Sequence, residues 1–206
     1  MSINQRQNHP KKGSKIKVEP IRKLKDINNL KKLLVNKPRD FCLFIVGINT
    51  DLRASDLLGL VARQVRGLKP GDDIEIKEIK THKPRRLTLN KACINALNAL
   101  LSSRVYNDED KLFQGQRGPI TVSYLNRLVK SWAKALNLRG NYGSHTLRKT
   151  FGYIKHTEQG ATLPELMVCF NHNTQCSIFN HFLPAFWILQ IGQQSTYHWV
   201  AIHYDL

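Results

Sequence analysis

Two kinds of hydrophobic spacing run through this chain of 206 residues, and they restrict its fold more than any other feature. Apolar side chains recur every three or four residues in several segments, which is typical of helices with one buried face. The longest of these segments are residues 24–36, 90–101 and 121–136. Residues 73–80 and 86–90 instead alternate apolar and polar side chains, as strands do. The sequence therefore predicts a mainly α-helical domain with one small antiparallel β-sheet, an α+β fold.

Polar residues, glycine and proline predict where the elements begin and end. Residues 82–84 connect the two strands as a hairpin, and Pro38 is expected to end the first helix. Asn90 stands in the capping position of one helix, and Thr162-Leu-Pro-Glu165 forms a capping box for another. The other expected elements are a buried helix or strand over residues 40–49, a short helix over 55–61, a loop over 137–143, and helices over 145–159 and from 162 to about 170.

Positive charge dominates the composition and is confined to one part of the chain. Lysine and arginine number 32 against 15 acidic residues, which gives a net charge of +17. Every basic residue lies at or before Lys155. Such a field attracts polyanions, so DNA or RNA is the expected partner class, ahead of an anionic membrane surface. We expect residues 1–23 to form a basic flexible arm, and residues 182–206 to form an atypical apolar tail.

Nothing in the sequence predicts export or insertion into a membrane. The opening residues are polar and basic, without the apolar segment of a secretory signal. The longest apolar run, Phe41–Ile48, is much shorter than the ~18–20 residues that span a bilayer. The 4 scattered cysteines favour free thiols in a reducing compartment. We therefore expect a cytoplasmic protein with no membrane partner.

Three groups of residues suit chemistry on a phosphate. Arg53 stands where a turn meets a short helix, and Lys80 lies in the predicted hairpin. His145 and Arg148 are three residues apart, so they share one face of a helix, and His172 follows 24 residues after Arg148. A guanidinium group can hold two phosphate oxygens at once, and an imidazole can exchange a proton near neutral pH.

In this order and spacing, the groups resemble the motifs of the tyrosine recombinases, also called the phage integrase family. Asp51–Leu58 is similar to the family's first arginine motif, and Lys80–Leu89 is similar to its lysine hairpin. His145–Phe151 is similar to its His-x-x-Arg box, and Phe170–His172 to its last histidine motif. The resemblance covers about residues 24–181, and it implies that this part folds as the family's catalytic domain.

The resemblance also implies the chemistry of DNA strand breaking and rejoining. Arg53 and Arg148 would hold the non-bridging oxygens of a phosphodiester, and Lys80 would protonate the departing 5′ oxygen. His145 would act as a base or hydrogen-bonding partner, and His172 would add a hydrogen bond to the phosphate. In this family a tyrosine attacks phosphorus and forms a 3′-phosphotyrosyl link. The resemblance implies no cofactor.

Other basic side chains beside these motifs are expected to contact DNA. They are Lys83, Arg85, Arg86 and Lys149. The register of the catalytic lysine stays open, because Lys77 or Lys83 could take the place of Lys80. The family resemblance implies double-stranded DNA as the partner, self-association on that DNA, and a location on the nucleoid.

The chain departs from the family pattern at the nucleophile. The family's tyrosine follows the last histidine by nine residues, and here that position is occupied by His181. Tyr197 and Tyr204, which lie 25 and 32 residues after His172, are the candidate substitutes. The loss of basic residues near this point favours the hypothesis that the coding end was altered, for example by a frameshift. The family's N-terminal helical domain is also not expected in the short segment before residue 24.

Three interpretations of function remain open. The first is a site-specific recombinase or integrase of a mobile genetic element, and the second is a catalytically dead, DNA-binding remnant of one. The third is a generic basic RNA-binding protein, for which the ordered set of motifs would have no use. A zinc site is a further alternative, formed by Cys169, His172, Cys176 and His181. That spacing is not a standard one and His172 already has a role, so we expect no metal site.

Overall fold

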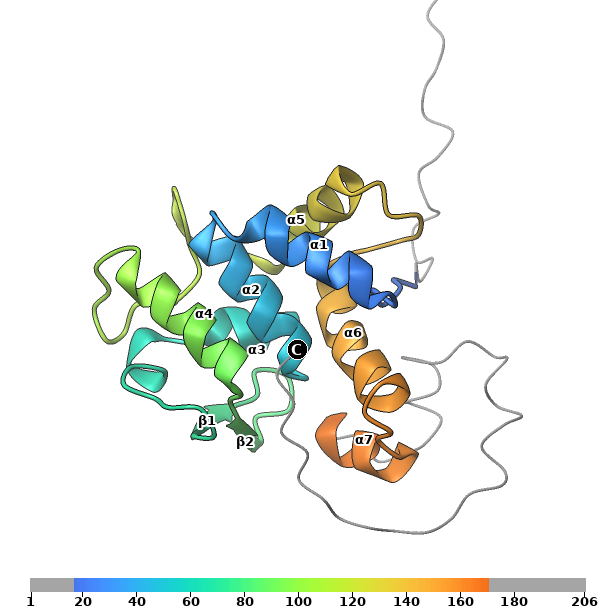
Figure 1. Cartoon of the computed structure of the whole chain (residues 1–206). Coiled ribbons are helices and arrows are strands. Elements are labelled where there is room, and N and C mark those ends of the chain that lie inside the picture. Colours follow the sequence, from blue (N-terminus) through green and yellow to red (C-terminus); the bar gives the residue numbers. More distant parts are fainter. Residues whose placement is uncertain (1–16, 171–206) are drawn as a thin grey trace, which may run out of the picture.

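In the computed structural model, the residues described are 17–170, and they form helices and two short hairpins (Figure 1). The helices are α1 (Leu24–Leu34), α2 (Pro38–Asn49), α3 (Ala54–Gly59), the short 3-10 helix η1 (Ala62–Gln64), α4 (Lys91–Ser102), α5 (Val122–Ala135), α6 (Ser144–Thr157) and α7 (Leu163–Phe170). The strands are β1 (Asp73–Lys77), β2 (Pro84–Thr88), β3 (Gln114–Gly115) and β4 (Gly118–Pro119). The predicted α+β fold, mainly helical with a small antiparallel sheet, is confirmed.

Helix α2 forms the centre of the hydrophobic core. Its side chains from Cys42 to Ile48 are buried, and it packs against α1, α4 and α6, which surround it in Figure 1. Burial on every face explains why the sequence of this segment is apolar without a clear period. The sequence predicted that Pro38 ends the first helix, but Pro38 is instead the first residue of α2. Proline suits that position because its missing N–H would have no partner inside the helix.

The capping residues predicted from the sequence take the expected positions. The side chain of Asn90 accepts a hydrogen bond from the backbone N–H of Cys93 (3.0 Å), and so begins α4. Glu165 accepts hydrogen bonds from the N–H (2.7 Å) and hydroxyl (2.8 Å) of Thr162 at the start of α7. Gly160, three residues after the end of α6, has a φ of +68°, a left-handed conformation that stops the chain from continuing as a helix.

The first hairpin joins β1 and β2 in antiparallel register, with Ile74 opposite Leu87. Ile74, Ile76 and Leu87 are buried on one face of this ribbon. The turn runs over residues 78–83. The sequence placed Pro84 in this connection, but Pro84 is the first residue of β2. The second hairpin, β3 and β4, has strands of 2 residues each, which are too short to leave a periodic signal in the sequence.

A glycine allows α2 and α6 to approach closely. A Cβ atom added to Gly47 would lie 2.6 Å from Cδ1 and 3.0 Å from Cβ of Leu147 on α6. Real Cβ atoms do not approach carbon atoms so closely, so any larger residue at position 47 would require the Leu147 side chain or α6 to shift. Because α6 carries His145 and Arg148, this contact sets the depth at which both side chains lie.

Residues 17–21, here called the N-terminal strap, run along α6 and the loop before it. The backbone N–H of Glu19 donates to the carbonyl of Asn141 (2.7 Å), and that of Ile21 donates to the hydroxyl of Thr150 (2.8 Å). Lys149 Nζ donates to the carbonyl of Val18 (2.9 Å). The strap therefore fixes the outer side of α6, while α2 fixes its inner side.

Among the helices that the structure describes, none combines the length and the apolar character needed to cross a membrane.

Candidate active site

Arg53 lies at the N-terminal end of α3, where the backbone changes from extended to helical. Its guanidinium is mostly buried, with 18% of the side chain exposed. Nη1 lies 2.8 Å from Oε2 of Glu78 and 3.8 Å from Oδ2 of Asp56. The short helix thus presents the arginine toward the hairpin, and two acids hold it there.

Lys80 lies in the turn between β1 and β2, where its side chain is exposed. The turn is attached to α3, because the backbone N–H of Ile79 donates to Oδ1 of Asp56 (2.9 Å). It is also closed on itself, because the N–H of His82 donates to the carbonyl of Glu78 (2.8 Å). These bonds hold the backbone next to Lys80 and leave its long side chain free to reach outward.

The start of α6 is built to present His145 and Arg148. The carboxamide oxygen of Asn126 on α5 accepts a hydrogen bond from the N–H of Ser144 (3.0 Å), which caps the helix from a neighbouring element. Gly143 leaves room for this cap, because a Cβ at that position would lie 2.3 Å from the same oxygen. The packing of α5 against α6 therefore fixes where the His-x-x-Arg box begins.

Arg148 is deeply buried, with 5% of the residue exposed. Its Nη2 donates to the carbonyl of Phe170 at the end of α7 (3.1 Å), and its guanidinium lies over the ring of Phe170 (4.9 Å). Among the described residues, Nη1 has no hydrogen-bond partner. Burial, with the nearby charges of Arg53 and Arg85, lowers the pKa of Arg148 to about 9. A buried guanidinium with a free donor and low pKa would gain strongly from an anion.

The environment of His145 shows that the predicted cationic residues converge. Burial of part of its ring lowers the pKa of His145, and the positive charges of Arg148, Lys149, Arg53 and Lys80 lower it further. Three of the other residues predicted as catalytic, Arg53, Lys80 and Arg148, therefore each lie within electrostatic reach of His145. This is the arrangement that a phosphate site requires.

We expect His145 to titrate below the pH range of an ordinary histidine in the DNA-free protein, and duplex DNA to raise its pKa. A phosphate in the site would offset the four positive charges that now disfavour protonation. The folded state binds this proton less readily than the unfolded state does, so the free energy of unfolding should fall as pH drops below the unfolded pKa. The measurement is an NMR titration of imidazole signals, assigned with His145→Gln. An ordinary pKa that DNA leaves unchanged would contradict the expected convergence.

Buried acids form the part of the site that the sequence analysis missed. Asp51 (3% exposed), Asp56 (4%) and Glu78 (0%) lie among the arginines. A signal for Glu78 was present, because the alternation of β1 places it on the same face as Ile74 and Ile76, which are buried. The acids balance the positive charge, so the site can hold several arginines close together before any DNA arrives.

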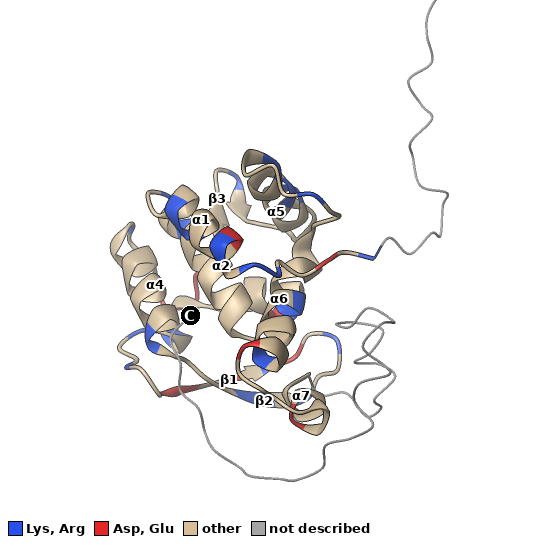
Figure 2. Ribbon diagram, turned by 45° about the vertical axis from the view of Figure 1, so that its right-hand side comes forward, with Lys and Arg blue, Asp and Glu red and all other residues tan. Residues whose placement is uncertain are grey.

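The residues predicted to contact DNA lie in different surroundings. Lys83 is exposed in the hairpin turn, and Arg86 is an exposed side chain of β2 that pairs with Asp73 across the ribbon (2.6 Å). Figure 2 shows the acidic residues of β1 beside the basic residues of β2. Arg85 points inward instead, where it pairs with Asp51 and Glu78 and donates to the carbonyl of Cys169. Lys149 donates to the strap.

Several predicted residues lie outside the described part of the chain. They are His172, His181, Tyr197 and Tyr204, together with Cys176 of the alternative zinc site. Within residues 17–170, no group of three or more histidine, cysteine or acidic side chains is arranged to hold a metal ion. Of the residues considered for zinc, only Cys169 is described, and its thiol is partly buried.

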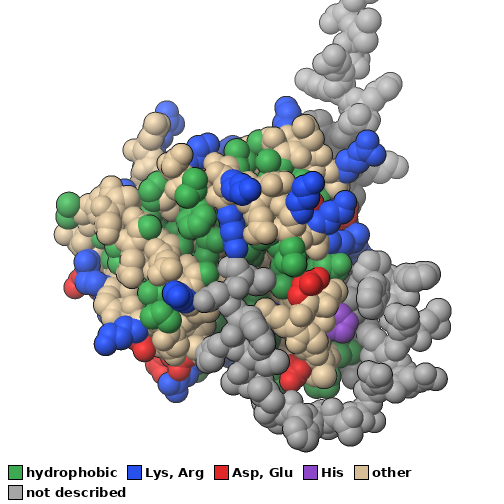
Figure 3. All heavy atoms as spheres, in the orientation of Figure 1, with side chains coloured by type: hydrophobic (Ala, Val, Ile, Leu, Met, Phe, Trp, Pro, Cys, Tyr) green, Lys and Arg blue, Asp and Glu red, His purple; other side chains and the backbone are tan. Residues whose placement is uncertain are grey.

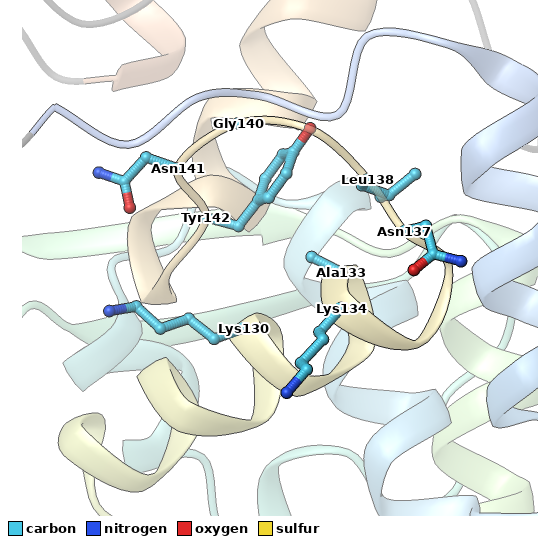
Figure 4. Close-up of a pocket in the computed structure, with 8 residues that line it drawn as sticks. All are labelled: Lys130, Ala133, Lys134, Asn137, Leu138, Gly140, Asn141 and Tyr142. Carbon is cyan, nitrogen blue, oxygen red and sulfur yellow. The ribbon is translucent and has the colours of Figure 1, made fainter.

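Basic side chains also gather away from the site, over α1 and α5 (Figure 3). The exposed residues of these helices and of the turn after α1 include Lys25, Lys32, Lys37, Arg127, Lys130 and Lys134. A pocket of about 480 Å³ lies beside this region, at the end of α5 and in the loop that follows (Figure 4). Lys130, Lys134 and Tyr142 are among its lining residues, and none of the predicted catalytic residues lines it.

Comparison with known sequences agrees with this geometry. The chain matches the Phage integrase family over residues 21–182. It is 34% identical over 160 residues to the probable integrase/recombinase YoeC of Bacillus subtilis (strain 168), an alignment that covers 76% of this chain and 84% of YoeC. It is 28% identical over 156 residues to the tyrosine recombinase XerC of Caldanaerobacter subterraneus subsp. tengcongensis. That alignment covers 70% of this chain and 42% of XerC.

Solved structures share the fold at low sequence identity. The XerA recombinase superposes with a TM-score of 0.67 at 18% identity, over 89% of this chain and 65% of XerA. The XerH recombinase bound to its palindromic difH substrate gives the same TM-score at 22% identity, over 86% of this chain and 53% of XerH. The chain thus spans between about half and two thirds of these proteins. The family match, the YoeC alignment and the shared fold confirm the predicted resemblance: the chain belongs to the phage integrase family of tyrosine recombinases.

Proposed function

We propose that this chain binds duplex DNA and that its site holds one phosphodiester for strand breaking and rejoining. The observation that carries the proposal is the buried guanidinium of Arg148, whose Nη1 has no hydrogen-bond partner among the described residues and which lies within electrostatic reach of Arg53 and His145. A buried guanidinium with an unpaired donor gains free energy when an anion accepts a hydrogen bond from that donor. A DNA phosphate would supply that anion.

The proposed roles follow from the position of each group. Arg53 and Arg148 would hold the non-bridging oxygens and offset the charge that builds up in the pentacoordinate transition state. Lys80, on its exposed turn, would protonate the departing 5′ oxygen, and His145, whose pKa is lowered, would accept or share a proton near the nucleophile. His172 would complete the set from beyond the described residues.

The partners of related proteins support DNA as the substrate class. Similar solved structures include XerH bound to difH substrate, the Tn1549 transposon integrase in complex with transposon right end DNA, and a lambda integrase dimer bound to a core site. We propose that this chain likewise binds duplex DNA, self-associates on that DNA and is located on the nucleoid. The domain limits at residues 23 and 181 also remain predictions.

A second candidate function is a DNA-binding remnant that no longer cleaves. It is favoured by the sequence at position 181, where histidine stands in place of the family's tyrosine. A generic RNA-binding protein is not favoured, because the chain belongs to the phage integrase family and a generic basic surface would not need a buried arginine beside His145. The remnant and the recombinase share DNA binding and differ only in the covalent step.

We expect duplex DNA binding that weakens steeply with salt. If the protein neutralises several phosphates, its affinity should fall by on the order of 10³-fold between 50 and 200 mM salt, because bound cations are released. Removing one arm lysine, as in Lys11→Ala, should cost less than about 2-fold, because the remaining charges still attract DNA.

The measurement is fluorescence anisotropy with a labelled duplex at several salt concentrations. A duplex RNA of the same length serves as the competitor that separates DNA from RNA binding. Absent or salt-independent DNA binding, or a preference for the RNA, would overturn the proposed function.

A further inference from the structure

One acid beside the site is completely enclosed by protein. Glu78 directly follows β1, and 0% of its surface is exposed. Its backbone N–H donates to the carbonyl of Lys83 (3.0 Å), and its carbonyl accepts from the N–H of His82 (2.8 Å). Glu78 therefore closes the hairpin turn in which Lys80 lies two residues later.

The carboxylate of Glu78 joins three parts of the site. It accepts a hydrogen bond from the hydroxyl of Thr81 in the turn, and another from Nη1 of Arg85 on β2 (2.9 Å). Its other contact is with Nη1 of Arg53 at the start of α3 (2.8 Å). One side chain thus touches both the turn that carries the proposed general acid and the arginine that is proposed to grip the phosphate.

Asp56, the acid on α3 itself, cannot fix Arg53 in the same way. Its Oδ2 lies 3.8 Å from Nη1 of Arg53, which is too long for a hydrogen bond. Its Oδ1 instead accepts the backbone N–H of Ile79. The short contact to Arg53 therefore comes from Glu78, which lies 25 residues farther along the chain.

Glu78 is charged despite its burial. Burial alone would raise the pKa of Glu78, but the Thr81 hydroxyl and the positive charges of Arg53 and Arg148 outweigh it and hold the pKa below its ordinary value. A carboxylate this close to a phosphate site opposes DNA binding by charge alone. Any benefit it brings to the site must therefore come from orienting the arginines.

We propose that Glu78 is a positioning residue, which fixes the Arg53 guanidinium for a DNA phosphate and ties it to the turn that carries Lys80. The inference rests on the proposed function for its substrate. In the DNA-free protein it predicts an ordered Arg53, so that the site needs little rearrangement when the phosphate arrives.

The first test compares Glu78→Gln with Glu75→Gln. Glu75 is exposed on β1 opposite Arg86, so its variant removes the same charge without removing either acid that lies beside Arg53. We expect Glu75→Gln to bind duplex DNA equally or up to about 2-fold tighter, because a repulsive charge is lost. We expect Glu78→Gln to bind roughly 10-fold more weakly, because Arg53 loses the ion pair that orients its guanidinium. Circular dichroism and thermal melting establish that each variant is folded, and a folded Glu78→Gln that tightens binding overturns the proposal.

The second test needs neither DNA nor a folded Glu78 variant. In NMR spectra of the DNA-free protein, the guanidinium protons of Arg53, assigned with Arg53→Lys, should exchange slowly with water. The exposed Arg117 serves as the reference for fast exchange. Exchange of Arg53 as fast as that of Arg117 would overturn the positioning role. If Arg53 is ordered but the protein binds no DNA, the proposed function fails and the role of Glu78 in holding Arg53 stands.

Discussion

On a nicked duplex, we expect the unmodified chain to bind without leaving a stable covalent 3′-phosphoprotein, and His181→Tyr to form one. The expectation comes from spacing, because His181 occupies the nucleophile position nine residues after His172, outside the described residues. An imidazole can attack phosphorus, but the resulting phosphoramidate is labile, whereas a phenol forms a lasting ester. The nick lets the cleaved strand diffuse away, so that rejoining cannot hide the adduct.

The measurement is a denaturing gel of protein mixed with a labelled nicked DNA. His181→Tyr should yield an adduct at least about 100-fold above the unmodified chain, since removing a nucleophile typically costs more than that. The double variant His181→Tyr with Arg148→Ala is the control, and it should lose the adduct because the phosphate is no longer held. A stable adduct from the unmodified chain would reject the dead-site hypothesis, and peptide mapping would then show whether Tyr197 or Tyr204 carries it.

Gly47→Ala should destabilise the protein by about 1–3 kcal/mol, the usual cost of overfilling a packed core. The new methyl group would lie 2.6 Å from Cδ1 and 3.0 Å from Cβ of Leu147, so the Leu147 side chain and α6 must adjust. For a domain of this size, that cost lowers the melting temperature by roughly 2–10 °C. DNA affinity should fall as well, because α6 also carries Arg148.

Gly59→Ala is the matched control for this prediction. It adds the same methyl group to a helix, but the nearest atom, Cδ1 of Ile79, is 3.5 Å away, at ordinary contact distance. Its melting temperature should stay within about 2 °C of the parent protein. The combined variant Gly47→Ala with Leu147→Ala should cost less than the sum of its parts, because the smaller residue makes room. Additive costs would show that the contact between α2 and α6 is not the cause.

Features that depend on residues close together in the sequence could be predicted from the sequence alone. Side-chain caps such as Asn90 act within one turn of their own helix, so the start of α4 could be predicted from neighbouring residues. The same holds for His145 and Arg148, whose spacing alone places them on one helix face. The resemblance to the family's motifs predicted the catalytic-domain fold, and the family match agrees with it.

The buried ionic network could not be predicted, because its pairs are distant in sequence. Arg85 was expected on the surface, but the structure turns it toward Asp51, which lies 34 residues away. The strand pattern of β2 places Arg85 on the same face as the buried Leu87, although arginine side chains are usually exposed. Which acid balances which arginine depends on how the hairpin packs against α3, and no local rule describes that packing.

The contacts of the N-terminal strap determine when the protein can complete its folding. Its side-chain hydrogen bonds join residues that are separated by 122 to 131 positions, so they form only after nearly all of the described domain has been synthesised. Contacts of such long range slow folding, because a large loop must close before they contribute. Until α6 leaves the ribosome, the apolar surface of α2 around Gly47 stays uncovered, and the nascent chain exposes it to chaperones and to aggregation. Helix α6, which is made late in synthesis, therefore covers α2 and brings His145 and Arg148 to the candidate site in the same step.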